Sequence, residues 1–168
     1  MEEKQYLDLS EYVSFDSVIH SKQVQDFLNK QISFNEQLHS FMKVNSQGCE
    51  DSFRIIDFLN QYQSLFLRGI YIKFYKKESL DIGFSFYIIE QFLNHKVVTF
   101  CAVAYDKNNF IEEKVVSDIQ DIINKEGRLT ITTTEKDYLF PTYMQFCKSK
   151  DYGTYKKVNN KYIFNFML

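Results

Sequence analysis

The pattern of apolar positions divides the chain near residue 69 into a helical part and a part rich in strands. Between residues 14 and 67 the apolar side chains recur at the three- and four-residue spacing of helix faces. These positions are Val24, Phe27, Leu28, Ile32, Phe34, Leu38, Phe41, Met42, Ile55, Ile56, Leu59, Tyr62 and Phe66. We therefore expect an α+β protein with a helical N-terminal third, residues 1–68, and a mixed-sheet region at 69–168. The two parts form either two domains or one continuous domain.

Strand periodicity begins at Gly69. Apolar residues at 70, 72 and 74 alternate with Tyr71, Lys73 and Tyr75, which predicts a strand. Residues 96–105 are rich in β-branched side chains and predict a buried strand. The stretch 82–93 between them fits both a strand and a helix, so its structure stays open.

The most regular element is a predicted helix over residues 111–126. Its Val and Ile side chains fall on one face. Glu112 and Glu113 in the first turn and Lys125 in the last turn match the helix dipole. Gly127 follows in the position of a C-terminal stop.

Four further elements are expected at the C-terminal end. Residues 129–133 and 138–140 form two alternating runs, joined by 134–137 and closed by Pro141, which predict a pair of strands. Residues 143–150 predict a short helix. Residues 154–166 predict a hairpin that turns at Asn159-Asn160, because asparagine tolerates the left-handed backbone of such turns.

Composition adds a charge asymmetry to this picture. The chain has 168 residues and a net charge of −2. From Arg128 onward seven basic residues face three acidic ones, a balance of +4, whereas thirteen basic and nineteen acidic residues precede it, a balance of −6. A basic end on an acidic body indicates contact with an anion. Only 3 of the 20 basic residues are Arg, which indicates an AT-rich genome and weakens lysine content as a sign of nucleic-acid binding.

Cysteine usage and hydropathy bear on the compartment. Three widely spaced cysteines without a C-x-x-C motif, and a start of Met-Glu-Glu-Lys without an apolar stretch, indicate an intracellular protein, nuclear or cytoplasmic. The longest apolar stretch, residues 97–105, is too short to span a bilayer, so we expect no membrane contact.

The sequence has no recognisable catalytic or metal-binding motif. No H-E-x-x-H, G-x-S-x-G or P-loop pattern occurs, and the 5 glycines include no glycine-rich phosphate-binding loop. No two Cys or His residues lie within four positions of each other, as a zinc site would need. We therefore expect a non-enzyme without metal or cofactor. The alternative is a small-molecule enzyme whose site residues are scattered along the chain.

The order of elements at the C-terminal end resembles a winged-helix module. A winged-helix module has a recognition helix followed by a two-stranded wing. The chain has the same order: helix 111–126, a glycine stop and then a pair of predicted strands. Hairpin 154–166 can also serve as the wing. Small accessory subunits of the telomere-capping CST complex combine winged-helix and OB modules, so an OB-type single-strand-binding subunit is a second alternative. The acidic helix favours winged-helix modules that dock protein.

The resemblance implies a non-catalytic subunit or adaptor with protein partners, and with nucleic acid as a further partner. Lysine can neutralise phosphate and tyrosine can stack on a base. The candidate contact residues are Tyr155, Lys156, Lys157, Lys161, Tyr162, Lys148 and Lys150.

Overall fold

One mixed β-sheet forms the centre of the protein. The computed structural model describes residues 9–18, 20–29, 69–78, 80–104 and 112–168. Within these ranges the sheet has the strand order β1-β2-β3-β4-β5-β7-β6. The strands are β1 Val13–Ser14, β2 Gly69–Lys77, β3 Leu80–Phe92, β4 His95–Ala104, β5 Arg128–Thr134, β6 Gly153–Val158 and β7 Lys161–Met167. All neighbouring strands in this order are antiparallel except β4 and β5.

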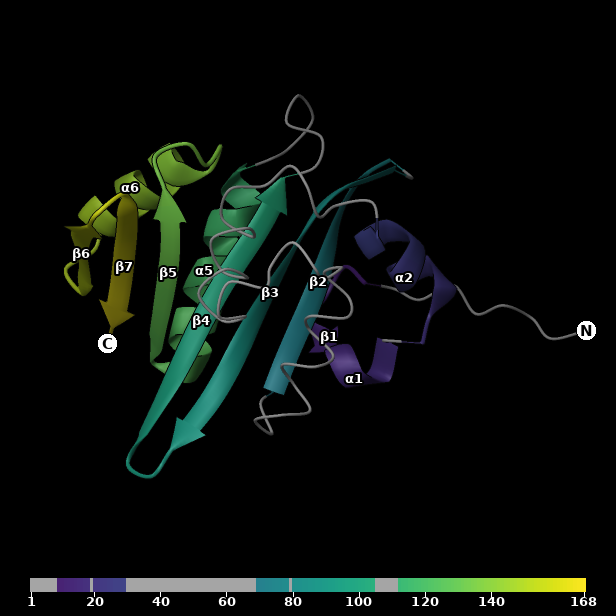
Figure 1. Cartoon of the computed structure of the whole chain (residues 1–168), viewed down its shortest axis with the longest axis horizontal. Helices are drawn as coiled ribbons and strands as arrows, with labels where there is room; N and C mark the ends of the chain where they lie inside the picture. The colour runs from purple at the N-terminus through teal and green to yellow at the C-terminus, as the bar shows by residue number, and fades with distance from the viewer. Residues whose placement is uncertain (1–8, 19, 30–68, 79, 105–111) are drawn as a thin grey trace, which may run out of the picture.

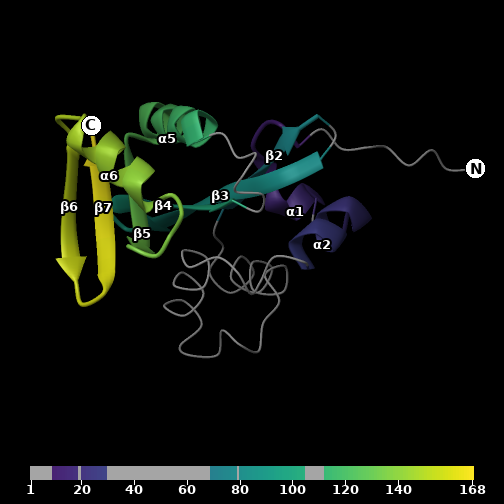
Figure 2. The same ribbon diagram turned by 90° about the horizontal axis from the view of Figure 1, so that it is seen from above.

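Helices cover both faces of the sheet. The short helices α1 (Phe15–Val18) and α2 (Lys22–Asn29) lie on one face, and α5 (Glu112–Glu126) lies on the other (Figure 2). Helix α6 (Phe140–Lys148) packs into the same core as α5. No helix of the described ranges is long and apolar enough to cross a membrane.

Strands β4 and β5 form a fork. They are parallel, and their register has a single pair, Thr99 with Thr130. From there the two strands diverge toward their carboxyl ends (Figure 1). Parallel neighbours need a crossover connection, and α5 supplies it here. The amino end of α5 therefore follows the open end of the fork.

The structure confirms the elements with the clearest periodicity. Helix α5 ends at Glu126, and Gly127 follows with a left-handed φ of +82°. Its buried face consists of Val115, Asp118, Ile119, Ile122 and Ile123. The C-terminal hairpin is formed by β6 and β7, with Asn159 at a φ of +57° in its turn. The predicted strands at 70–75 and 96–105 are β2 and β4.

The open stretch 82–93 is strand β3. Its interior is buried on both faces of the sheet: Phe84, Phe86 and Ile88 point to one face, while Ser85 and Tyr87 are equally buried on the other. Burial on both faces removes the polar alternation that marks a half-exposed strand. For that reason the sequence pattern did not separate strand from helix.

The winged-helix prediction is wrong. Residues 129–133 lie in β5, which pairs with β4 and β7, not with residues 138–140. Tyr138 and Leu139 form a turn, and Pro141 stands in the first turn of α6. A proline is accepted there because the N–H that it lacks has no partner within the helix. The predicted short helix at 143–150 exists but begins earlier, at Phe140.

The predicted fold class also needs correction at the N-terminal end. A sheet of seven strands dominates the described part of the chain, and its first strand, β1, lies in the region predicted to be helical. Most of the helical stripes fall at residues 30–68, outside the described residues. The division into 1–68 and 69–168 stays a prediction.

Candidate functional site

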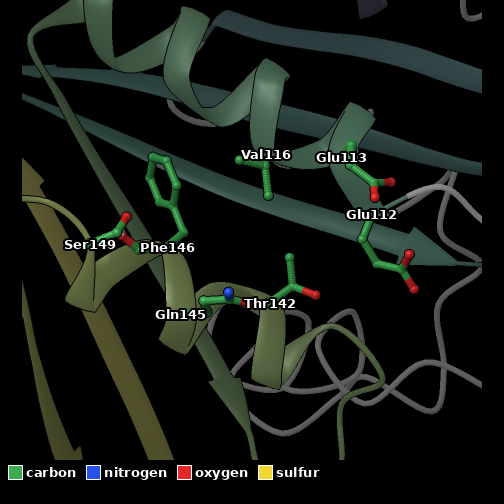
Figure 3. Close-up of a pocket in the computed structure, with 7 residues that line it drawn as sticks. All are labelled: Glu112, Glu113, Val116, Thr142, Gln145, Phe146 and Ser149. Atoms are coloured by element: carbon green, nitrogen blue, oxygen red, sulfur yellow. Dashed lines mark hydrogen bonds between the residues drawn. The ribbon is translucent and has the colours of Figure 1, made fainter.

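A pocket of about 430 Å³ lies between helices α5 and α6 (Figure 3). It is lined by Glu112, Glu113 and Val116 of α5, by Thr142, Gln145 and Phe146 of α6, and by Ser149. Helix α5 follows the carboxyl end of β4, and α6 follows the carboxyl end of β5. The pocket therefore lies at the open end of the fork.

The walls of this pocket differ in character. Val116 and Phe146 supply apolar surface, and Gln145 and Thr142 supply amide and hydroxyl groups. Glu112 and Glu113 place two carboxylates at its α5 end. The Tyr138 hydroxyl donates a hydrogen bond to Glu112 Oε1. This bond raises the pKa of Tyr138 above the ordinary tyrosine value of 10.0.

A second pocket of about 420 Å³ lies at the carboxyl end of β5. Its lining residues are Thr134, Glu135, Lys136, Lys157 and Asn160. The Tyr162 hydroxyl donates to Glu135 Oε1 at 2.7 Å, and Lys157 Nζ lies 3.6 Å from the same oxygen. Both groups lower the pKa of Glu135, which is therefore a carboxylate at neutral pH.

One short loop connects the two pockets. Residues 135–139 join β5 to α6; Glu135 and Lys136 line the second pocket, and Tyr138 contacts Glu112 in the wall of the first. Buried Asp137 fixes this loop, because its carboxylate accepts hydrogen bonds from the Thr133 hydroxyl at 2.6 Å and from the Leu139 N–H at 3.0 Å.

A buried polar network holds α5 against strands β2 and β3. Asp118 accepts hydrogen bonds from Lys73 Nζ and from the Tyr75 hydroxyl, each at 2.6 Å. The Ser85 hydroxyl lies 2.7 Å from the Tyr75 hydroxyl and 2.6 Å from that of Tyr12. Because every one of these side chains has a partner, we interpret the network as structural: it fixes the helix that carries one wall of the first pocket.

The described cysteines do not suit nucleophilic chemistry. Cys101 and Cys147 are buried free thiols. Burial raises the pKa of both, and the charge of Asp137 adds to the effect at Cys101. A thiol with a raised pKa supplies little of the reactive thiolate at neutral pH. Among the described residues, no group of three or more His, Cys, Asp and Glu side chains could hold a metal ion.

The structure distributes the seven predicted contact residues over several positions. Tyr155, Lys156 and Lys157 lie on β6, and Lys161 and Tyr162 lie on β7. Lys148 ends α6, and Lys150 stacks over the Phe146 ring, with Nζ 5.3 Å from the ring centroid. Of this set, Lys157 lines one of the two pockets described above. Tyr162 contacts the second pocket indirectly, because its hydroxyl donates a hydrogen bond to Glu135, which lines that pocket.

Sequence reasoning missed the residues of the first pocket. Glu112 and Glu113 were interpreted only as charges that match the helix dipole. Val116 and Phe146 have no signal of their own, because an apolar residue on a helix predicts burial and not a ligand. The proximity of α5 and α6 depends on the crossover between β4 and β5, which no local pattern predicts.

Comparisons with known proteins identify the fold. No protein-family model matches the chain, and no curated protein matches its sequence. Among solved structures, a ribosomal-protein-alanine N-acetyltransferase from Brucella melitensis is 6% identical, with a TM-score of 0.54 over 94% of this chain and 98% of its own. The PaiA N-acetyltransferase from Thermoplasma acidophilum, in complex with coenzyme A, is 10% identical, with a TM-score of 0.52 over 86% and 94%. The N-acetyltransferase PseH from Campylobacter jejuni, in complex with acetyl coenzyme A, is 11% identical, with a TM-score of 0.51 over 94% and 97%.

These likenesses overturn the functional prediction made from the sequence. A winged-helix adaptor, a subunit of a telomere complex and a DNA-binding role all rested on an element order that the sheet topology contradicts. The predictions of a non-enzyme and of protein and nucleic-acid partners depended on the same winged-helix interpretation and are corrected with it, because the fold is that of N-acetyltransferases. The chain has the fold of N-acetyltransferases.

Proposed function

We propose that this protein is an acyltransferase that moves an acetyl group from coenzyme A to an amine. The observation that carries the proposal is the shared fold, which extends over 86–94% of this chain in the three N-acetyltransferases compared above. Two of those structures hold coenzyme A or acetyl coenzyme A. In acetyl coenzyme A the acetyl group is held as a thioester; an amine can attack its carbonyl carbon to form an amide, and the coenzyme A thiol leaves.

The fork between β4 and β5 supports this proposal. Beyond Thr99 and Thr130 the two strands have no further register pairs in the described ranges. The edge of β4 that faces β5 can therefore offer backbone N–H and C=O groups to an extended ligand, as an exposed sheet edge does to a peptide. The amide-containing arm of coenzyme A is such a ligand. Val116 and Phe146 then offer apolar surface beside it.

The described residues fit the uncharged arm of coenzyme A and do not fit its phosphates. The amino end of a helix normally favours an anion. Here Glu112 and Glu113 occupy the first turn of α5 and line the pocket, so two like charges oppose a phosphate at this position. We therefore assign the pocket to the arm and the acyl group only.

Glu112 is our candidate for accepting a proton from the acceptor amine. Its carboxylate lines the pocket, and the protonated Tyr138 hydroxyl holds it in place through a hydrogen bond. A carboxylate within hydrogen-bond reach of an amine is a competent general base. Because burial keeps the described thiols protonated, we favour direct transfer over an acyl-cysteine step.

The proposal is tested by calorimetry and by release of free thiol. The protein should bind acetyl coenzyme A and release thiol in the presence of a panel of primary amines, with product that has gained an acetyl group by mass spectrometry. Val116→Tyr should fill the pocket and abolish binding. Ser117→Tyr is the matched control, because Ser117 is the next residue of α5 and is exposed.

Two results would contradict this function. One is the absence of binding to acetyl coenzyme A. The other is binding that Val116→Tyr and Ser117→Tyr affect equally, because the ligand would then lie outside the pocket between α5 and α6.

A further inference from the structure

The second pocket lies where an acceptor could approach the first. Glu135 and Lys136 in its wall belong to the same loop as Tyr138, which contacts Glu112 in the first pocket. Thr134 is the last residue of β5, four positions beyond the pair that closes the fork. A molecule bound here thus lies at the open end of the fork. This inference rests on the proposed acyl transfer.

The charges of this pocket favour an anion. Lys136 and Lys157 bring two ammonium groups, and Glu135 brings one carboxylate. That carboxylate already contacts Lys157 and accepts the Tyr162 hydroxyl. Lys136 has no ion-pair partner among the residues that the structure describes. Its ammonium group can therefore donate charge-assisted hydrogen bonds to a carboxylate or phosphate oxygen.

We propose that the pocket of Lys136 and Lys157 recognises an acid group on the acceptor, so that the substrate is an amine that carries a carboxylate or a phosphate. The acid group is held at the end of β5, and the amine extends toward Glu112. The loop of residues 135–139, fixed by buried Asp137, sets the distance between the two ends of the substrate.

The anion site is tested first without any acyl donor. Inorganic phosphate should raise the melting temperature of the protein above that in sodium chloride of equal ionic strength, because a ligand of the folded state stabilises it. Lys157→Gln and Lys136→Gln should each reduce this rise. Lys156→Gln is the control, since it removes the same charge from the neighbouring position of β6 and Lys156 does not line the pocket.

The second arm uses matched acceptors in the acetyl-transfer assay. A short peptide amine with a free C-terminal carboxylate is compared with its C-terminal amide, and a phosphate-bearing amine with its phosphate-free counterpart. For the preferred acid, Lys157→Gln should raise KM by roughly tenfold and change kcat little, as expected when a charged hydrogen bond to bound substrate is lost. The pair in which the acid-bearing amine is acetylated faster than its acid-free counterpart shows whether the pocket binds a carboxylate or a phosphate.

The outcomes separate this inference from the proposed function. Stabilisation by phosphate that depends on Lys136 and Lys157 supports the anion site even if no amine is acetylated, a result that would count against acyl transfer alone. No stabilisation, or an equal loss in Lys156→Gln, would overturn the anion site. Acetylation without preference for acid-bearing amines would overturn its role in acceptor binding.

Discussion

At the scale of single residues, the buried polar groups separate into satisfied and unsatisfied ones. Asp118 and Asp137 are buried, and both accept two hydrogen bonds. Thr133 is fully buried and donates to Asp137. Thr134, its neighbour in β5, has a buried hydroxyl without a partner. The two adjacent threonines therefore differ: the Thr133 hydroxyl stabilises the fold, and the Thr134 hydroxyl is unsatisfied within the described residues.

Replacement of each threonine by valine should show this difference. Thr133→Val leaves the Asp137 carboxylate without one of its donors and should lower the free energy of unfolding by about 1–3 kcal/mol. Thr134→Val removes an unsatisfied hydroxyl at constant shape and should leave stability unchanged or raise it by up to about 1 kcal/mol. Urea unfolding measures both. An equal loss in the two variants would mean that Thr134 has a partner within the fold.

The tyrosines of the buried network should make stability sensitive to alkaline pH. Burial is the largest cause that raises the pKa of Tyr12 and Tyr75 above the ordinary value of 10.0. The unfolded chain releases these protons near pH 10, but the folded chain retains them. The contribution of the two tyrosines to the free energy of unfolding is therefore complete below pH 10 and is lost as the pH rises above 10. Each such tyrosine adds a slope of about 1.4 kcal/mol per pH unit.

The measurement is urea unfolding between pH 9 and pH 11, roughly one unit either side of the ordinary tyrosine pKa. Tyr12→Phe should reduce the alkaline slope, and it leaves Ser85 its hydrogen bond with Tyr75. Tyr155→Phe, on exposed β6, is the control and should keep the slope of the parent protein. An unchanged slope in Tyr12→Phe would show that its hydroxyl is accessible to solvent.

At the scale of elements, α5 has two tasks. Its apolar face packs against the sheet, and its first turn supplies carboxylates to the pocket. The network of Asp118, Lys73 and Tyr75 fixes the rotation of the helix, because a turned helix would leave a buried carboxylate without partners. Structure and site therefore depend on the same element.

The packing of α5 can be tested on its two faces. Ile119 is fully buried, and Ile119→Ala should lower the free energy of unfolding by about 2–5 kcal/mol. Asp121→Ala, on the exposed face, should cost little. Gln120 is a poorer control, because it accepts a hydrogen bond from the Tyr152 hydroxyl. Similar denaturation midpoints for Ile119→Ala and Asp121→Ala would contradict the orientation of the helix.

At the scale of the whole molecule, the structure shows where the charge asymmetry of the sequence lies on the fold. The excess of lysine after Arg128 lies on the part of the fold formed by β5, α6 and the hairpin, where Lys136 and Lys157 line a pocket. The first turn of α5, by contrast, brings Glu112 and Glu113 to the other pocket. The two pockets thus differ in the sign of their charges, which is the basis for assigning the donor arm to one and an acid-bearing acceptor to the other in our proposals.

This arrangement predicts how charge at α5 affects binding of the donor. Glu113→Gln should tighten the binding of coenzyme A by up to roughly fivefold, since it removes a like charge that opposes the phosphates, and an interaction between exposed charges is worth about 0.2–1 kcal/mol. Pantetheine, which lacks the phosphates, should bind both proteins equally. Isothermal titration calorimetry at low and high salt measures the difference, which salt should reduce.

Asp121→Asn removes an exposed carboxylate farther along α5 and serves as the control. A gain in affinity for pantetheine equal to that for coenzyme A would show that Glu113 acts by shape and not by charge.

The sequence by itself determined the elements whose signals are local. Helix α5 followed from one apolar stripe and its glycine stop, and the β6–β7 hairpin followed from two alternating runs around Asn159-Asn160. Such patterns depend on neighbours a few positions apart, so they survive without knowledge of the fold. They also explain why the winged-helix interpretation arose, because a helix followed by strands is a local order shared by many folds.

Only the tertiary structure decided the sheet order, the fork and the two pockets. The parallel pairing of β4 with β5 joins Thr99 to Thr130 across a crossover, and the pocket joins Val116 to Phe146 across two helices. Contacts of this kind form because apolar faces must find each other to leave water, and their partners lie far away along the chain. The two candidate pockets depend on those long-range contacts, which is why their lining residues form no motif in the sequence.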